Sequence, residues 1–254
     1  MRSTLVILSA LLAQLAAPPP AAAPAPAAVP ASVAAPPPAP PPPAAPSAVA
    51  PEPEPGSPLH QTRIDAQRFK VVERDSGPVS YYKILDEPEG AFIRAVYRPP
   101  LETVTLGVEL PEELRQGTRK LRWRWRPQVL PRRGDECRSG FTDSAAVLYV
   151  SWKRGFRYFA IKYVWSSVGQ KGRVCDQRRY VFVTQDTVIL ESGGPVGVWK
   201  DEEIDLAAEF RKHFADGDAN ADVPDLIGIG LMSDGDQTHS ISAADYGGFL
   251  LLHP

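Results

Sequence analysis

The stretch Lys-Leu-Arg-Trp-Arg-Trp-Arg at residues 120–126 decides the fold that we expect for this chain. Its side chains alternate strictly in character, and successive side chains of a β-strand point to opposite faces. Trp123 and Trp125 would therefore share one face of a strand, and the three arginines would share the other. One face is expected to be buried in a core, and the other to meet water or a ligand.

Two apolar runs follow this stretch, at residues 145–152 and 157–165. Only a short segment with Gly155 separates them, which suits a hairpin rather than a crossover helix. The three runs together predict neighbouring strands of an antiparallel sheet. Weaker runs predict further strands at residues 69–72, 81–85, 91–97, 103–110, 180–184, 187–190, 225–231 and 246–252.

The spacing of apolar residues changes between residues 204 and 214. Leu206, Phe210 and Phe214 recur at every fourth position, which predicts one short amphipathic helix. The polar segment 166–179 contains glycines and predicts a long loop. Many short strands with one helix are typical of an all-β protein, and we expect an antiparallel β-sandwich or jelly roll.

Composition divides the chain into three parts. Residues 1–17 have a basic start, an apolar run and small residues at the end, which predicts a secretory signal peptide. An uncleaved membrane anchor is the alternative, although the run is shorter than the roughly 18 residues of a membrane span. Residues 18–58 are almost wholly Pro and Ala and predict a disordered tether, either a spacer or a linker without a special role. Residues 59–254 predict one β-sandwich domain, periplasmic or secreted.

Cys137 and Cys175 are the cysteines of this chain. An even number of cysteines behind an export signal favours a disulfide. The predicted antiparallel pairing supports this bond, because it brings the segment before the second strand next to the segment after the third. Two free thiols are the alternative.

Charge and motifs exclude several classes of function. The net charge is −2 and acidic and basic residues are intermixed, so there is no general attraction to nucleic acid. The sequence contains no nucleophile elbow, no metalloprotease helix motif, no phosphate-binding loop and no dinucleotide-binding glycine pattern. Its 4 histidines are scattered without ligand spacing, so we expect no zinc site and no cofactor.

Several spaced motifs lie between residues 82 and 249. They are Trp123-Arg-Trp125, Asp143 followed by Ala145-Ala146 and Tyr149-Val150, Tyr163-Val-Trp165, Trp199, Ser233-Asp-Gly-Asp-Gln-Thr238 and Tyr246-Gly247. Together they resemble the bacterial family called domain of unknown function 3047. The resemblance implies a secreted or periplasmic jelly roll similar to carbohydrate-binding modules, without an established activity. The chain departs from the family at Thr142, Val147 and Gly248, where the family tends to have charged residues.

The aromatic and charged residues of the predicted strands indicate a glycan site. Aromatic rings stack on the CH faces of sugars, while Arg and Asp side chains bind their hydroxyl groups. The candidate ligand-binding residues are Arg124, Arg126, Asp143, Tyr149, Tyr163, Trp165, Asp234 and Asp236. In the alternative interpretation the aromatic side chains fill the core and the arginines form a solvated face.

Two acidic loops place oxygen atoms at alternate positions, as a calcium-binding EF-hand loop does. They run from Asp216 to Asp222 and from Asp234 to Ser240. Neither loop has the glycine expected at its sixth position, although Asp245 occupies the twelfth position of the second. Such loops are more often plain turns, so calcium is a minor expectation.

Glu203, Asp205 and Glu209 are similar to the acids of jelly-roll glucanases, which alternate along a strand. The spacing differs here, because Glu209 lies four residues past Asp205. The segment is more typical of the start of a helix. We therefore expect these acids to be structural.

These observations together predict a non-enzymatic binding module of the cell envelope, with glycans as its ligand class. A jelly-roll glycoside hydrolase that uses loop carboxylates is one alternative, and a protein-interaction domain in an envelope assembly is another. A hydrolase needs two carboxylates about 5–10 Å apart in a cleft. A protein partner needs an exposed apolar patch.

Overall fold

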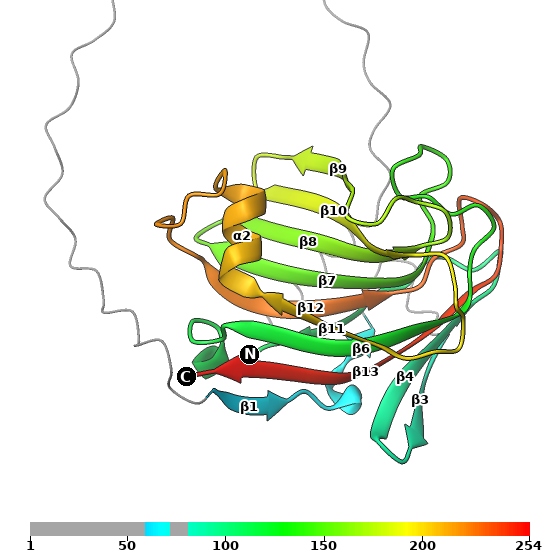
Figure 1. Cartoon of the computed structure of the whole chain (residues 1–254), viewed down its shortest axis with the longest axis horizontal. Coiled ribbons are helices and arrows are strands. Elements are labelled where there is room, and N and C mark those ends of the chain that lie inside the picture. The colour runs from blue at the N-terminus through cyan, green and yellow to red at the C-terminus, as the bar shows by residue number, and fades with distance from the viewer. Residues whose placement is uncertain (1–58, 72–80) are drawn as a thin grey trace, which may run out of the picture.

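The computed structural model describes residues 59–71 and 81–254. Within them two β-sheets face each other with a hydrophobic core between them (Figure 1). The predicted all-β sandwich is therefore confirmed. The predicted signal peptide (1–17), the predicted linker (18–58) and residue 72 of a predicted strand lie outside the described residues. None of the helices that the structure describes is long and apolar enough to cross a bilayer.

The six-stranded sheet is built around β13. This strand pairs with β6 on one side and with β4 and β1 on the other, in each case antiparallel. The order across the sheet is β11-β6-β13-β4-β3, with β1 beside β13. Its strands are β1 (His60–Arg63), β3 (Tyr82–Glu87), β4 (Gly90–Tyr97), β6 (Lys120–Val129), β11 (Lys200–Asp205) and β13 (Ser242–His253).

The seven-stranded sheet has the order β2-β5-β12-β7-β8-β10-β9. β7 and β8 form the predicted antiparallel hairpin. β8 and β10 instead run parallel, so this sheet is mixed rather than wholly antiparallel. The segment 167–182 carries the chain back to the end of the sheet where β8 starts, as a parallel neighbour requires. The strands are β2 (Lys70–Val71), β5 (Leu106–Glu109), β7 (Ser144–Arg154), β8 (Arg157–Ser166), β9 (Val174–Arg179), β10 (Val183–Ser192) and β12 (Asp225–Met232).

The tryptophan strand β6 lies in the opposite sheet from β7 and β8, so the three runs are not neighbours as predicted. The predicted burial of its tryptophan face is correct, since Trp123 and Trp125 are 1% and 0% exposed. They contact Tyr163 and Trp165 of β8 across the core, with ring centroids 6.1 and 5.8 Å apart. The alternating tryptophans of β6 therefore pack against the facing sheet and not against a neighbouring strand.

Two polar edge strands were not predicted. β9 lies in the segment expected to be a loop, and β11 lies where the helix was expected to begin. Both are outermost in their sheets, and β11 has Ile204 as its one buried side chain. The strands predicted at 180–184 and 187–190 are instead the single strand β10, preceded by a turn at residues 180–182. Edge strands bury little, so their apolar pattern is weak.

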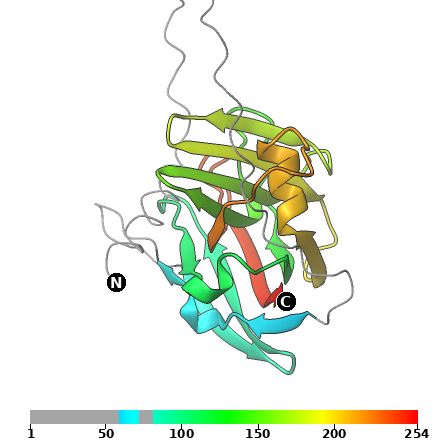
Figure 2. The same ribbon diagram turned by 90° about the vertical axis from the view of Figure 1, so that its left-hand side faces the viewer.

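The α-helix α2 (Leu206–Phe214) confirms the predicted helix and follows β11 directly (Figure 2). Asp205 caps its N-terminus, because its carboxylate accepts a hydrogen bond of 2.9 Å from the backbone N–H of Ala208. Phe210 lies in the core and packs on the ring of Trp152, with centroids 5.7 Å apart. The apolar face of α2 therefore belongs to the same core as the two sheets.

His213 of α2 lies between two carboxylates. Its Nδ1 donates a hydrogen bond to Asp186 of β10 at 2.8 Å, and its Nε2 is 3.6 Å from Glu209. Tyr163 donates a hydrogen bond of 2.8 Å to Glu209. Burial alone would lower the pKa of His213, but the two carboxylates raise it above its ordinary value. The neighbouring His213 ring is also the main reason why the pKa of Glu209 falls to about 2.

Replacing His213 with glutamine is expected to lower the free energy of unfolding by about 1.5–3 kcal/mol in mildly acidic solution, the range for hydrogen bonds to charged groups. The pKa is raised in the folded state, so this stabilisation is fully present below the unfolded pKa of about 6.5. It is lost as pH rises through the folded pKa. Urea unfolding at several pH values should therefore show the gap between wild type and variant shrinking above neutral pH; a constant gap would contradict a charged ring.

The predicted disulfide between Cys137 and Cys175 is present, with Cα atoms 5.3 Å apart. It joins the loop before β7 to the edge strand β9. Cys137 also packs against a cluster of buried apolar residues that includes Tyr149 of β7. The bond therefore fixes the loop at residues 130–143 beside the seven-stranded sheet.

Candidate functional site

One face of the seven-stranded sheet points away from the core and carries polar side chains. Leu148, Val150 and Trp152 of β7 belong to the core between the sheets, so the alternate residues of β7 point outward. Cross-strand register extends this outer face over β8 and β10. We call it the polar face after its polar members Tyr149, Ser151, Lys162, Gln185 and Thr187. The same face also carries the buried apolar residues Val147, Ala160, Val164 and Ile189.

Small residues separate the polar side chains of this face. Ser151 lies opposite Ala160, which in turn lies opposite Gln185. On the other side of β7, Gly228 and Gly230 of β12 lie opposite Ser151 and Tyr149. At these two glycines, β12 has no side chain of its own that covers its backbone.

Several polar atoms of this face have no hydrogen-bond partner among the residues that the structure describes. They are the hydroxyl oxygens of Ser151 and Thr187 and both amide atoms of Gln185. All three residues are 0% exposed. An unsatisfied buried polar group costs about 1–3 kcal/mol, so such a set calls for a partner. Neutral donors and acceptors in two adjacent cross-strand rows suit a neutral polar ligand.

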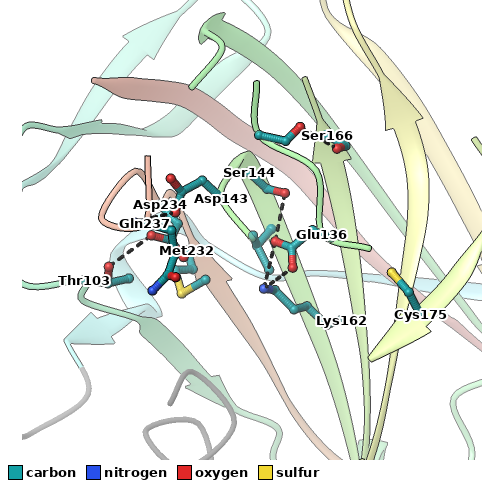
Figure 3. A network of polar contacts seen from close by, with 12 residues as sticks. Thr103, Glu136, Asp143, Ser144, Lys162, Ser166, Cys175, Met232, Asp234 and Gln237 are labelled. Atoms are coloured by element: carbon teal, nitrogen blue, oxygen red, sulfur yellow. Dashed lines mark hydrogen bonds and ion pairs between the residues drawn. The ribbon is translucent and has the colours of Figure 1, made fainter. Parts of the chain in front are cut away.

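Lys162 lies in the middle of the polar face and forms a buried ion pair with Glu136 (Figure 3). Its Nζ lies 2.9 Å from each carboxylate oxygen, and the Ser144 hydroxyl donates to Glu136 at 2.9 Å. Burial alone would lower the pKa of Lys162, but the Glu136 carboxylate raises it well above its ordinary value. The ammonium group is therefore charged, and the loop that carries Glu136 is held over the sheet.

Three carboxylates form a cluster at the end of this face, beyond β12. Asp143, Asp234 and Asp236 each place an oxygen within 4.8 Å of the others. The backbone N–H groups of Gln237 and Thr238 donate to Asp143 at 3.2 and 2.7 Å. Figure 3 shows Asp143 beside Asp234 and Gln237. Asp236 is exposed, so the cluster reaches solvent.

Asp234 is the most perturbed acid of this carboxylate cluster. Burial raises its pKa well above the ordinary value, and the negative charges of Asp236 and Asp143 add to the effect. The hydroxyl of Thr103 donates to it at 3.2 Å. Burial therefore favours the protonated form of Asp234, which can donate a hydrogen bond as well as accept one.

The predicted aromatic platform is not formed. Tyr163 and Trp165 belong to the core between the sheets and are 1% and 3% exposed. Tyr149 does lie on the polar face, but its ring is fully buried and its hydroxyl donates to the sulfur of Met232 at 3.8 Å. Strand alternation directs Tyr163 and Trp165 to the core side of the seven-stranded sheet and Tyr149 to the other side. The rings are buried on both sides. None of them offers a ring face to a sugar.

Arg124 and Arg126 lie on the other sheet, away from the carboxylate cluster. Both guanidinium groups stack on the ring of Trp199, at 4.4 and 4.3 Å from its centroid. Arg126 also pairs with Asp245 at 2.7 Å and with Glu87. The predicted ligand-binding residues therefore divide between two sheets, and only the three aspartates come together.

The candidate calcium loops differ in what their acids contact. The loop from Asp234 to Ser240 supplies two carboxylates to the cluster, while its third is Asp143 from before β7. Asp245, the twelfth position, instead binds Arg94 and Arg126 on the six-stranded sheet. Calcium at this loop remains a prediction.

In the loop from Asp216 to Asp222, Asp218 accepts a hydrogen bond from the backbone of Asn220, and Asp222 pairs with Arg154. Among the described residues this loop does not bring three acidic or histidine side chains within reach of one ion. Calcium at this loop also remains a prediction.

The three glucanase-like acids have separate structural partners. Glu203 pairs with Lys120 and Arg122 of the neighbouring strand. Asp205 caps α2, and Glu209 binds Tyr163 and His213. Each of these acids therefore has a partner within the fold.

The comparison with protein families gives a clear result. The family described as "Protein of unknown function (DUF3047)" matches residues 78–250. The chain belongs to the DUF3047 family. The resemblance expected from its spaced motifs is thus confirmed, whereas no curated protein matches this DUF3047 chain.

Solved structures show distant likenesses to this DUF3047 chain. One is the family 11 carbohydrate-binding module of the cellulosomal cellulase Lic26A-Cel5E of Clostridium thermocellum (TM-score 0.41, 11% identity, covering 78% of this chain and 97% of that one). Another is endoglucanase cel12A from Rhodothermus marinus (0.40, 10%, 77% and 96%). A third is the xyloglucanase domain of NopAA from Sinorhizobium fredii, in complex with cellobiose (0.35, 8%, 78% and 100%). The sandwich assignment of the DUF3047 chain rests on its own two sheets.

Sequence reasoning missed most of the polar face. Lys162 and Glu136 were not considered, although a lysine inside the apolar run 157–165 is a signal that a charge is buried there. Ser151, Gln185 and Thr187 carry no sequence signal, because their importance depends on the cross-strand register of this DUF3047 domain.

Proposed function

We propose that this DUF3047 domain is a non-enzymatic glycan-binding module whose ligand enters at the carboxylate cluster, where Asp236 is exposed, and reaches the polar groups of the polar face. These groups are buried, so binding requires displacement of what covers them. One observation carries the proposal. Ser151, Gln185 and Thr187 form a buried set of neutral donors and acceptors without partners among the described residues. Each hydroxyl group of a sugar both donates and accepts hydrogen bonds, so a glycan is a ligand class that matches such a set.

The carboxylate cluster supports the same ligand. Asp236 can accept hydrogen bonds from the hydroxyl groups of a sugar, while Lys162 has donor capacity beyond its two contacts with Glu136. Asp236 is exposed and marks the end that a ligand reaches from solvent. Recognition would then depend on hydrogen bonds rather than on stacked rings.

The disulfide supports an extracytoplasmic location for this module. Disulfides persist in the periplasm and outside the cell, and are rare in the reducing cytoplasm. The bond between Cys137 and Cys175 therefore favours the periplasmic or secreted location expected from the signal-like start of the chain. A role in the cell envelope is part of the proposal.

Calorimetric titration of the full chain with soluble glucan, xylan and mannan oligosaccharides and peptidoglycan fragments is expected to identify a ligand. Gln185→Leu and Thr187→Val remove hydrogen-bonding atoms at nearly constant volume. Each substitution should lower the affinity for that ligand roughly twofold to tenfold, which is the effect of one lost hydrogen bond. Because the removed atoms lack partners in the described residues, thermal stability should not fall.

Arg124→Gln, on the opposite sheet, is the matched control and should leave the affinity unchanged. Repeating the titration in calcium and in chelator tests the predicted calcium site separately. No binding to any glycan of the panel, or equal loss in the control, would overturn the proposal.

A glycoside hydrolase is the second candidate. Burial raises the pKa of Asp234 beside Asp143 and Asp236, which would suit a general acid. Their oxygens lie within 4.8 Å of one another, closer than the carboxyl separation of about 5–10 Å that glycosidic hydrolysis uses, so the binding module is favoured. Release of new reducing ends from the same panel, abolished in Asp234→Asn, would establish the hydrolase function. Binding of a glycan without the release of new reducing ends would favour the non-enzymatic binding module.

A further inference from the structure

Two hairpin tips lie side by side at one end of the seven-stranded sheet (Figure 1). One joins β7 to β8 and carries Phe156, and the other joins β9 to β10 at residues 180–182. The parallel register places Val183 opposite Tyr158, and the backbone N–H of Tyr158 donates to the carbonyl of Phe182 at 2.8 Å. The tips are therefore adjacent and fixed by strand pairing.

These tips expose large apolar side chains. Phe156 is 86% exposed, Val181 79%, Phe182 61% and Tyr180 48%. Single exposed apolar residues are ordinary, but a contiguous group on adjacent turns marks an interaction surface. We call these four residues the hairpin-tip surface.

Basic side chains surround the hairpin-tip surface. Arg157 follows Phe156 directly, and its guanidinium group has no carboxylate partner among the described residues. Arg179 lines the same hollow of about 340 Å³ as Arg157 and residues 180–182. Arg154 pairs with Asp222, and Arg179 pairs with Asp186. Arg157 is therefore the cation most available to an external anion.

We propose that the hairpin-tip surface docks on a lipid membrane with anionic headgroups. Phe156, Val181 and Phe182 would enter the boundary between headgroups and acyl chains, where aromatic side chains are favoured. Arg157 would bind lipid phosphate groups in the same plane. Charge complementarity favours this occupant, since an apolar tip next to an unpaired arginine matches an anionic bilayer surface.

Co-sedimentation of the full chain with vesicles tests the proposal. Binding is expected to vesicles of equal parts phosphatidylcholine and phosphatidylglycerol, and to be weaker with phosphatidylcholine alone. The double variant Phe156→Ser/Phe182→Ser should weaken binding at least about tenfold, because each ring loses its apolar burial in the bilayer. Arg157→Gln should weaken it roughly fivefold, and only on the anionic vesicles.

Val168→Ser is the matched control, since Val168 is 63% exposed and follows the other end of β8. It should bind as the wild type does. All these side chains are exposed, so unchanged thermal unfolding will verify that the variants fold. Absent binding by the wild type, equal binding to both vesicle types, or unaltered binding by the double variant would overturn the proposal. A wild-type dimer that the double variant dissociates, without vesicle binding, would assign the surface to self-association instead.

Discussion

Replacing Glu136 with alanine is expected to lower the free energy of unfolding by about 3–5 kcal/mol, as for other buried ion pairs that lose one partner. Lys162 would lose its counter-ion in a site where it is 7% exposed and where Glu136 supplies both of its contacts. Its amine would then either stay charged without compensation for its desolvation or give up its proton, and both outcomes destabilise the folded state. Equilibrium urea unfolding monitored by tryptophan fluorescence gives the free energy directly.

Two comparisons make this prediction specific. Glu203→Ala removes a carboxylate from a pair with Lys120 whose side chains are 34% and 37% exposed, and should cost about 0–1 kcal/mol. The double variant Glu136→Ala/Lys162→Met removes both buried charges and should recover much of the stability lost in Glu136→Ala. Equal losses in the single and double variants would show that the loop, rather than the charge, determines the effect.

Removing the disulfide through Cys137→Ser/Cys175→Ser is expected to lower the free energy of unfolding by about 4 kcal/mol. The bond closes a loop with a sequence separation of 38 residues, and the loss of that constraint raises the entropy of the unfolded chain. Glu136 precedes Cys137, so the variant should also loosen the contact with Lys162 and weaken any glycan bound to the polar face.

Urea unfolding of the oxidised protein, the reduced protein and the double serine variant measures this effect. The reduced protein and the variant should agree within about 1 kcal/mol, because both lack the same constraint. A variant as stable as the oxidised wild type would show that the loop is held by its other contacts alone.

The strand pattern predicted those parts of the fold in which burial and periodicity coincide. Trp123 and Trp125 are buried on one face as expected, and the β7–β8 hairpin has its predicted turn. α2 was predicted because Leu206, Phe210 and Phe214 repeat with the helical period. In each case the apolar side chains themselves carry the information.

Pairing partners and edge strands could not be predicted in the same way. An alternating pattern shows that a strand has a buried face, but not which strand lies beside it or opposite it. β6 was therefore placed next to β7 instead of facing it. β9 and β11 bury few side chains at the sheet edges, and their polar sequences resemble a loop and a helix start.

The candidate site illustrates the same limit. Asp143 was predicted from the family motifs and Asp234 and Asp236 also from an acidic loop, and the three meet in one cluster, since turns at strand ends gather at one edge of a sheet. Tyr163 and Trp165 were assigned to a ligand because aromatic residues suit both sugars and cores, and the core contains them. The role of Gln185 depends on its register with Ala160, a relation that no local pattern contains.

The central position of β13 has a consequence for biosynthesis. This strand holds β1, β4 and β6 together, so their sheet cannot be completed before the ribosome has passed residue 253. The tryptophans of β6 therefore lack their final strand neighbour until β13 has been synthesised. Until then the apolar side chains of β6 are exposed to aggregation, and only the arrival of β13 allows this sheet to close over them.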